Sequence, residues 1–171
     1  IIGPGTETRV NFDNCIFYRN ISDGSGWGSG GAILIDNVQE AKFVNCIFRE
    51  NNVLNQGSGG AVYIYDDPSD GQATLHVFDN CQFKRNGIQY GTINEQKWSN
   101  GGALSIQGAA VIENCVLDSN YIRHEYANTG ETMSASGGAI FIGLGGDGNN
   151  ISSWNDIPFS IIRANQISNT E

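Results

Sequence analysis

Apolar and variable residues alternate in four short segments that each begin with Gly-Gly-Ala. A period of two is typical of a β-strand with one buried face, so each segment predicts one strand. The residues expected to face inward are Ile33, Ile35, Val62, Ile64, Leu104, Ile106, Ile140 and Ile142. The residues expected to face outward are Leu34, Tyr63, Ser105 and Phe141.

A second pattern alternates with the first and occupies residues 12–20, 43–51, 78–86 and 112–120. It starts with an apolar residue and continues with Asn-Cys, a large apolar residue and a final asparagine. Phe12 and Cys15 are three residues apart, so one flat strand cannot point both side chains inward, and a corner must lie between them. Asparagine tolerates the left-handed backbone conformation that a tight corner requires. The predicted corner residues are Asn14, Asn45, Asn80 and Asn114.

After this corner, the cysteine and the large apolar residue two positions later share the inward face. These residues are Cys15, Cys46, Cys81, Cys115, Phe17, Phe48, Phe83 and Leu117. A second asparagine row closes the strand and consists of Asn20, Asn51, Asn86 and Asn120. If the copies stack at the strand spacing of about 4.8 Å, both asparagine rows can hydrogen-bond amide to amide along the stack. Gly-Gly would leave room where a side chain would collide.

The cysteines recur at intervals of 31, 35 and 34 residues, which suits one coil of a solenoid. Three short strands, three corners and one long loop insertion per turn predict an all-β fold, a right-handed parallel β-helix. Its handedness follows from the general rule for parallel crossovers. The segment FSIIRANQISN, residues 159–169, predicts a degenerate last coil, which makes about five coils. We expect residues 1–171 to form a single domain, as a segment of a longer chain or as the protomer of a fibre.

The two alternating motifs resemble a known family. GGAI, GGAV, GGAL and GGAI, together with FYRN, FREN and FKRN, are similar to the GGA(I/L/V) and FxxN repeats of polymorphic outer-membrane proteins. The resemblance covers residues 9–142, although LDSN replaces the phenylalanine by leucine and the fifth coil lacks the cysteine. It implies a surface-exposed β-helical passenger domain, an extracellular or cell-surface location, and a role in adhesion or surface structure without chemistry.

Composition restricts the partners. A net charge of −9 and a pI of about 4.5 oppose binding to nucleic acid or to an anionic membrane surface. No apolar run approaches the roughly 18 residues of a transmembrane helix. The first residues lack the charged and apolar regions of a signal peptide, and the chain does not begin with Met. We therefore expect no nucleic-acid partner, no membrane span in this segment, and a mature or excised piece of a protein.

The four cysteines form a ladder and lack the close spacing of a zinc site, so the sequence predicts no metal there. Disulfides between neighbouring coils and a column of reduced, buried thiols both remain open. Calcium is the one cofactor for which there is a candidate site, because carboxylate oxygens suit a hard cation. The candidate ligands are Asp66, Asp67, Asp70 and Asp147. The alternative is a solvated acidic turn.

The insertions contain the aromatic residues that are candidates for ligand binding. Such side chains stack on sugars or anchor a protein partner, or else they fold back against the column. They are Trp27, Trp98, Trp154, Tyr90, Tyr121 and Tyr126. Two sequons place candidate glycosylation sites at Asn20 and Asn150. Asn150 is favoured because Asn20 would have to leave its ladder to carry a glycan.

A row of outward positions precedes the second asparagine row. It consists of Arg19, Arg49, Lys84, Arg85, Asp118 and Ser119. Pectin-degrading enzymes also use parallel β-helices, but they need clustered carboxylates, or a basic residue beside calcium, in one groove. No pair with complementary roles recurs beside this row, and His76 and His124 stand alone in the sequence. The sequence therefore predicts no enzyme, and a solvated stripe is the simpler interpretation of the row.

Two functions are compatible with these patterns. The first is adhesion, in which the column presents variable loops to a glycan or protein receptor. The second is a structural protomer that self-associates end to end into an extracellular fibre or wall. A polysaccharide lyase or hydrolase is the third alternative.

Overall fold

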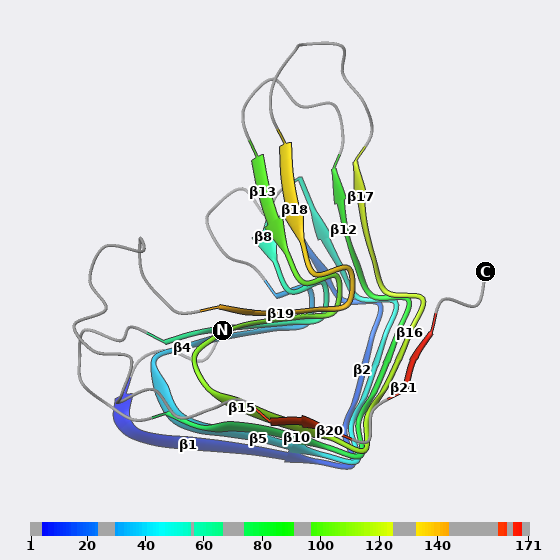
Figure 1. Ribbon diagram of the computed structural model, residues 1–171. Coiled ribbons are helices and arrows are strands. Elements are labelled where there is room, and N and C mark those ends of the chain that lie inside the picture. Colours follow the sequence, from blue (N-terminus) through cyan, green and yellow to red (C-terminus); the bar gives the residue numbers. More distant parts are fainter. Residues whose placement is uncertain are drawn as a thin grey trace.

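The strands of successive repeats lie side by side in parallel sheets (Figure 1). The computed structural model describes residues 5–23, 30–55, 57–66, 74–90, 97–124, 133–143, 161–163 and 166–168. Over these ranges the protein consists of β-strands and contains no helix. The described part of the chain consequently has no helical segment of the length and apolar character that crossing a bilayer requires.

Five sheets contain the described strands, and we number them in chain order. The first contains β1 (Gly5–Asp13), β5 (Val38–Val44), β10 (His76–Asp79), β15 (Ala110–Glu113) and β20 (Ile161–Arg163). The second contains β2 (Ile16–Tyr18), β6 (Ile47–Arg49), β11 (Gln82–Lys84), β16 (Val116–Asp118) and β21 (Gln166–Ser168). The third contains β3 (Ile21–Ser22), β7 (Asn52–Leu54), β12 (Gly87–Tyr90) and β17 (Tyr121–His124). The fourth contains β8 (Gly57–Ser58), β13 (Lys97–Asn100) and β18 (Met133–Ser136). The fifth contains β4 (Ile33–Asp36), β9 (Val62–Tyr65), β14 (Leu104–Gln107) and β19 (Ile140–Gly143).

The first and fifth sheets form two facing layers, and the second sheet joins them along one side (Figure 1). These three sheets correspond to the three strands per repeat that the sequence predicts. The third and fourth sheets project away from them, and we call this pair of sheets the arm. The expectation of three strands per repeat is therefore wrong, because parts of the insertions after the second asparagine row pair as strands between repeats.

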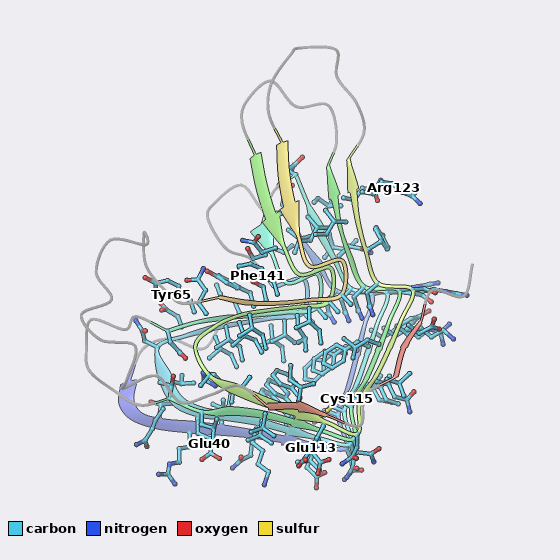
Figure 2. The ribbon with its side chains drawn as sticks, viewed as in Figure 1. Glu40, Tyr65, Glu113, Cys115, Arg123 and Phe141 are labelled. Carbon is cyan, nitrogen blue, oxygen red and sulfur yellow. The ribbon has the colours of Figure 1, made fainter. Side chains whose placement is uncertain are left out.

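The repeats stack in register. Phe12 pairs with Phe43, Phe43 with Phe78, and Phe78 with Ile112 in the first sheet. Side chains on the outer face of this sheet, such as Glu40 and Glu113, point away from the layers (Figure 2). Equivalent positions of the two sequence patterns thus lie directly above one another.

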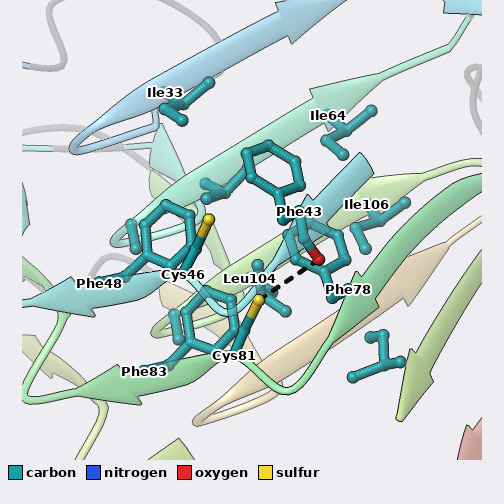
Figure 3. Packing of buried hydrophobic residues seen from close by; sticks show 14 of the residues in the cluster. Ile33, Phe43, Cys46, Phe48, Ile64, Phe78, Cys81, Phe83, Leu104 and Ile106 are labelled. Carbon is teal, nitrogen blue, oxygen red and sulfur yellow. Dashed lines mark hydrogen bonds between the residues drawn. The ribbon is translucent and has the colours of Figure 1, made fainter. Parts of the chain in front are cut away.

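Two phenylalanine rows fill the space between the layers (Figure 3). Phe43 stacks on Phe78 with ring centroids 4.7 Å apart, and Phe48 stacks on Phe83 at 4.7 Å. The two rows meet edge to face, with 5.7 Å between the centroids of Phe43 and Phe48. Offset stacks and edge-to-face contacts are the arrangements that aromatic rings prefer. The aliphatic row opposite includes Ile64, which is fully buried.

The first corner has the predicted backbone but only part of the predicted ladder. Asn14, Asn45, Asn80 and Asn114 have φ angles of 54°, 54°, 52° and 56°. Nδ2 of Asn80 donates to Oδ1 of Asn45 over 2.7 Å. Asn14 and Asn114 instead donate to the carboxylates of Asp13 and Asp79. This row is exposed, so its amides can donate to nearby carboxylates and do not need a partner amide.

The second asparagine row forms a continuous ladder. Oδ1 of Asn86 accepts from both the backbone N–H and Nδ2 of Asn51, over 3.1 and 2.9 Å. Nδ2 of Asn86 donates to Oδ1 of Asn120 and to the carbonyl of Phe48. The same pattern joins Asn20 to Asn51. Asn51 and Asn86 are fully buried, and these bonds occupy the polar atoms of both amides.

The four cysteines are free thiols, and each directly precedes a strand of the second sheet. Sγ of Cys81 lies 3.5 Å from the carbonyl oxygen of Phe43 (Figure 3) and 3.4 Å from that of Asp79. Burial raises the pKa of the Cys46 thiol. The cysteine row is therefore a column of small thiol side chains that pack in or against the core.

The outward residues Tyr63 and Ser105 are covered rather than exposed to solvent. Both point away from the core, yet Tyr63 is 7% exposed and Ser105 is fully buried. Alternation along a strand assigns a side chain to one face of the sheet but does not tell whether another layer covers that face. The arm rises from this side of the fifth sheet (Figure 1) and has a small core of its own, in which Ile122 packs on Val53 and Ile88.

Removing one member of the ladder should strongly destabilise the protein. Asn86→Ala removes the side-chain amide that bonds to the backbone N–H and Nδ2 of Asn51 and to the carbonyl of Phe48. Each buried polar group that loses its hydrogen bond costs about 1–3 kcal/mol. We expect the free energy of unfolding, measured with urea, to fall by about 4 kcal/mol. The matched control is Asn80→Gly in the exposed row, where the left-handed backbone suits glycine and the loss should stay below about 1 kcal/mol. Equal effects of the two substitutions would contradict the ladder's structural role.

Stability should decline in alkali because of Tyr63. Burial raises the pKa of Tyr63 to about 12 from its ordinary value of 10. Between pH 10 and 12 the unfolded chain loses the phenolic proton of Tyr63 while the folded chain keeps it. The contribution of this group to stability is complete below pH 10, and the free energy of unfolding falls by about 2 kcal/mol as the pH rises to 12. Urea unfolding at pH 9 and pH 12 measures this loss. Tyr63→Phe should reduce the difference between the free energies of unfolding at pH 9 and pH 12. An unchanged difference would contradict the assignment of the loss to Tyr63.

Candidate ligand-binding groove

A groove of about 510 Å³ lies where the second sheet meets the arm. One of its walls is the corner that connects the second and third sheets, and the other is the adjoining face of the third sheet. Its lining residues are Arg19, Ile21, Glu50, Asn52, Arg85, Ser119, Tyr121 and Arg123. Arg123 lies on the arm, on the side of β17 that faces away from the fourth sheet (Figure 2).

The corner wall is built from residues in the left-handed conformation. Arg19, Glu50, Arg85 and Ser119 have φ angles of 54°, 55°, 54° and 52°, and each directly precedes an asparagine of the ladder. This conformation costs a residue with a Cβ roughly 1–2 kcal/mol. The sequence shows these positions as an outward row but does not reveal their backbone, because none of the four is glycine or asparagine. The turn directs their side chains out of the column while the next residue points in.

The other wall carries an aromatic side chain held in a fixed position. The hydroxyl of Tyr121 donates to Oδ1 of Asn52, two strands away, over 2.8 Å. Its ring covers Gly87 on the intervening strand, where a Cβ would collide with the ring atoms. Glycine is required at this position because of the close approach. Partial burial raises the pKa of Tyr121, so the phenol stays neutral at physiological pH.

A single carboxylate lies among the charged residues of the lining. Glu50 accepts from Arg19 over 2.8 Å and from Arg49 over 2.9 Å. The hydrogen bond from Arg19 lowers the pKa of Glu50, and the same bond raises the pKa of Arg19. Glu50 is therefore an ionised partner for arginines and is poorly suited to act as a general acid near neutral pH.

The groove collects positive charge in an acidic protein. Of the nine Lys and Arg residues of the chain, three line it and two lie next to it, although the net charge is −9. The two neighbours, Arg49 and Lys84, form ion pairs with Glu50 and Asp118. Arg85 and Arg123 have no carboxylate partner within the ranges that the structure describes. Among the described residues they are therefore cations without a counter-charge at the groove.

The charged and aromatic side chains of the lining limit the chemistry of the groove. Glycoside hydrolysis uses two carboxylates with different protonation states. The described lining offers Glu50 alone, and Glu50 is held as an anion. Arginines bind carboxylate and sulfate groups with two parallel hydrogen bonds, and a tyrosine ring offers an apolar face with a polar tip.

The sequence-predicted aromatic residues fall on or near the arm. Tyr90 lies in β12 and Trp98 in β13, and the structure describes their backbones only. Trp27, Trp154 and Tyr126 lie outside the described residues. Tyr121 is the aromatic residue of the insertions that the structure places in the groove.

The acidic turn contains a buried network that the sequence did not predict. Nε2 of His76 lies 2.7 Å from Oδ2 of Asp66, and Thr74 donates to the same oxygen over 2.6 Å. Nδ1 of His76 accepts from the backbone N–H of Ala41. His76 is thus not isolated, and Asp66 is not part of a solvated turn, because the partners approach one another only in the folded stack. Asp67, Asp70 and Asp147 lie outside the described residues, within which no cluster of three potential metal ligands occurs.

The two sequons differ in what the structure describes. Nδ2 of Asn20 donates to Asn51 over 2.9 Å, so a glycan on this nitrogen would interrupt the ladder. Asn150 lies outside the described residues.

Comparison with known proteins finds no family model, no curated protein and no solved structure that matches the chain.

Substitutions around Tyr121 test the construction of the groove wall. Tyr121→Phe removes the bond to Asn52 and should lower the free energy of unfolding by about 1 kcal/mol. Gly87→Ala displaces the ring and should lower it by about 1–3 kcal/mol. The control is Tyr18→Phe, because Tyr18 is exposed on the second sheet and should give no measurable change. A Gly87→Ala variant as stable as the wild type would contradict the described position of the ring.

Proposed function

We propose that this chain is a surface-exposed right-handed parallel β-helix that acts in adhesion, with the groove as its binding site for a glycan or protein. The observation that carries the proposal is the pair Arg85 and Arg123, which have no carboxylate partner among the described residues, beside the fixed ring of Tyr121. Ligand sites combine a few placed polar groups with aromatic surface on a rigid support.

The parallel sheets support the β-helical part of this proposal. Strands of successive repeats are parallel neighbours in all five sheets, and β4 continues through Asn37 directly into β5. The chain therefore passes from the fifth sheet of one repeat to the first sheet of the next. Right-handed connection is the general rule for parallel strands.

The location outside the cell rests on the resemblance of the repeats to those of polymorphic outer-membrane proteins. The groove adds a reason to prefer adhesion to enzymatic activity. Arg19 keeps its proton more strongly than usual and Glu50 keeps its negative charge, so neither is suited to transfer a proton near neutral pH. A site of this kind retains a ligand without transforming it.

Binding by the immobilised protein to a panel of glycans and extracellular-matrix proteins tests this function. We expect at least one class of ligand to bind, and the double variant Tyr121→Ala/Arg123→Ala to bind it at least tenfold more weakly. Lys42→Ala removes one exposed cation from the first sheet, which does not line the groove, and should bind like the wild type.

Three results would contradict the proposal. The first is that the wild type binds no member of the panel. The second is release of new reducing ends or unsaturated products from a bound polysaccharide, which would indicate a hydrolase or lyase. The third is concentration-dependent growth of filaments without ligand binding, which would favour the structural protomer.

A further inference from the structure

We infer that the groove binds an acidic oligosaccharide, whose carboxylate or sulfate groups contact Arg85 and Arg123 and one of whose sugar rings packs against Tyr121. This inference rests on the proposed function and names the class of ligand for the same site. Four features of the groove support it.

The first feature is the spacing of the cations. Arg19 and Arg85 occupy the same corner position in repeats that are separated by one other repeat, so they lie two strand spacings apart, about 9.6 Å. The repeat between them contributes Glu50, which is bonded to Arg19 and Arg49. Along this row Glu50 neutralises Arg19, and Arg85 has no ion-pair partner among the described residues. Arg85 at the corner and Arg123 on the arm are therefore the cations that the groove offers to an acidic ligand.

The second feature is the type of cation. The residues of the lining that carry positive charge are all arginines. A guanidinium group binds a planar carboxylate, or two oxygens of a sulfate, through parallel N–H donors. Arg123 also lies over the ring of Tyr121, 5.5 Å from its centroid. This contact places an acid-binding group at the aromatic ring.

The third feature separates a sugar from a peptide. An acidic peptide commonly gains affinity by adding a strand to an exposed sheet edge. The groove is instead bounded by the face of the third sheet, where Asn52, Gly87 and Tyr121 occupy paired positions of adjacent strands. A sheet face offers side chains and no backbone donors in a row. An aromatic ring on that face suits the C–H surface of a sugar.

The fourth feature is the conformation of Arg85. Its φ angle of 54° is one that glycine adopts without a steric penalty. Arg19, Glu50 and Ser119 adopt the same conformation at this corner, so the fold imposes it, and it directs the side chain of Arg85 outward. Arg85 is exposed, and within the described ranges it makes no ion pair that would account for the side chain structurally.

Isothermal titration calorimetry with four defined probes tests the inference. The probes are a hyaluronan decasaccharide, a heparin decasaccharide, a neutral maltodecaose and a decaglutamate peptide. We expect one or both acidic oligosaccharides to bind, the maltodecaose and the decaglutamate to bind at least tenfold more weakly, and the affinity to fall as salt is added. Binding of hyaluronan would identify carboxylate as sufficient, whereas binding of heparin alone would identify sulfate as the recognised group.

Two substitutions at the corner should change affinity in opposite directions. Arg85→Gly should weaken binding of the acidic oligosaccharide at least tenfold, while its melting temperature equals or exceeds that of the wild type because glycine adopts the left-handed conformation without a steric penalty. Glu50→Gln should strengthen binding severalfold, because it removes the carboxylate that occupies Arg19 and Arg49. Lys42→Ala changes the net charge as Arg85→Gly does, outside the groove, and should leave the affinity unchanged.

Several outcomes would overturn the inference. Equal affinity for decaglutamate would mean that the groove accepts any polyanion, and equal affinity for maltodecaose would mean that charge is not recognised. Unchanged affinity in Arg85→Gly would place the site elsewhere. If a neutral glycan or a protein binds and Arg85→Gly has no effect, adhesion stands and the acidic ligand is wrong. If none of these probes and no member of the adhesion panel binds, both proposals fail.

Discussion

The hydrogen-bonded ladder of Asn20, Asn51, Asn86 and Asn120 is the constraint on which the rest of the structure depends. The side-chain oxygens of Asn51, Asn86 and Asn120 each accept from both the backbone and the side chain of the asparagine in the repeat before. A buried amide without partners is costly, so the repeats are held in one register. That register places phenylalanine on phenylalanine and thiol above thiol, and a shift by one residue would reverse the faces of every strand.

At the corner of the asparagine ladder, one position serves stability and the position before it is available for ligand binding. The ladder asparagine points into the column, and the residue before it must adopt the left-handed conformation and point out. Packing therefore restricts the inner position to asparagine and leaves the outer side chain free to vary. The outer positions hold two arginines, a glutamate and a serine, and these form one wall of the groove. The scaffold thus tolerates changes of ligand preference at the outer position without loss of its register.

The features that are best predicted from the sequence are those whose residues recur in every repeat. Phe43, Cys46 and Asn51 recur with fixed offsets, so the inward rows, the first corner and the parallel stacking follow from the pattern. The arm does not follow, because Val53 and Ile88 lie in segments too short and too dissimilar to show alternation. Contacts between residues that do not recur could not be predicted from the sequence either. Tyr121 and Asn52 are 69 residues apart, and Asp66 meets His76 only after the fold has formed. The groove is thus made of positions whose proximity depends on the completed stack.

Amide hydrogen exchange followed by NMR tests the central role of the ladder most directly. The structure predicts that the side-chain NH₂ groups of Asn51 and Asn86 exchange nearly as slowly as the most protected backbone amides of the core strands, because their opening requires disruption of the stack. The side-chain NH₂ group of Asn80, in the exposed row, should exchange far faster. Rapid exchange of the Asn51 and Asn86 side chains, at rates similar to that of Asn80, would contradict a ladder that fixes the register.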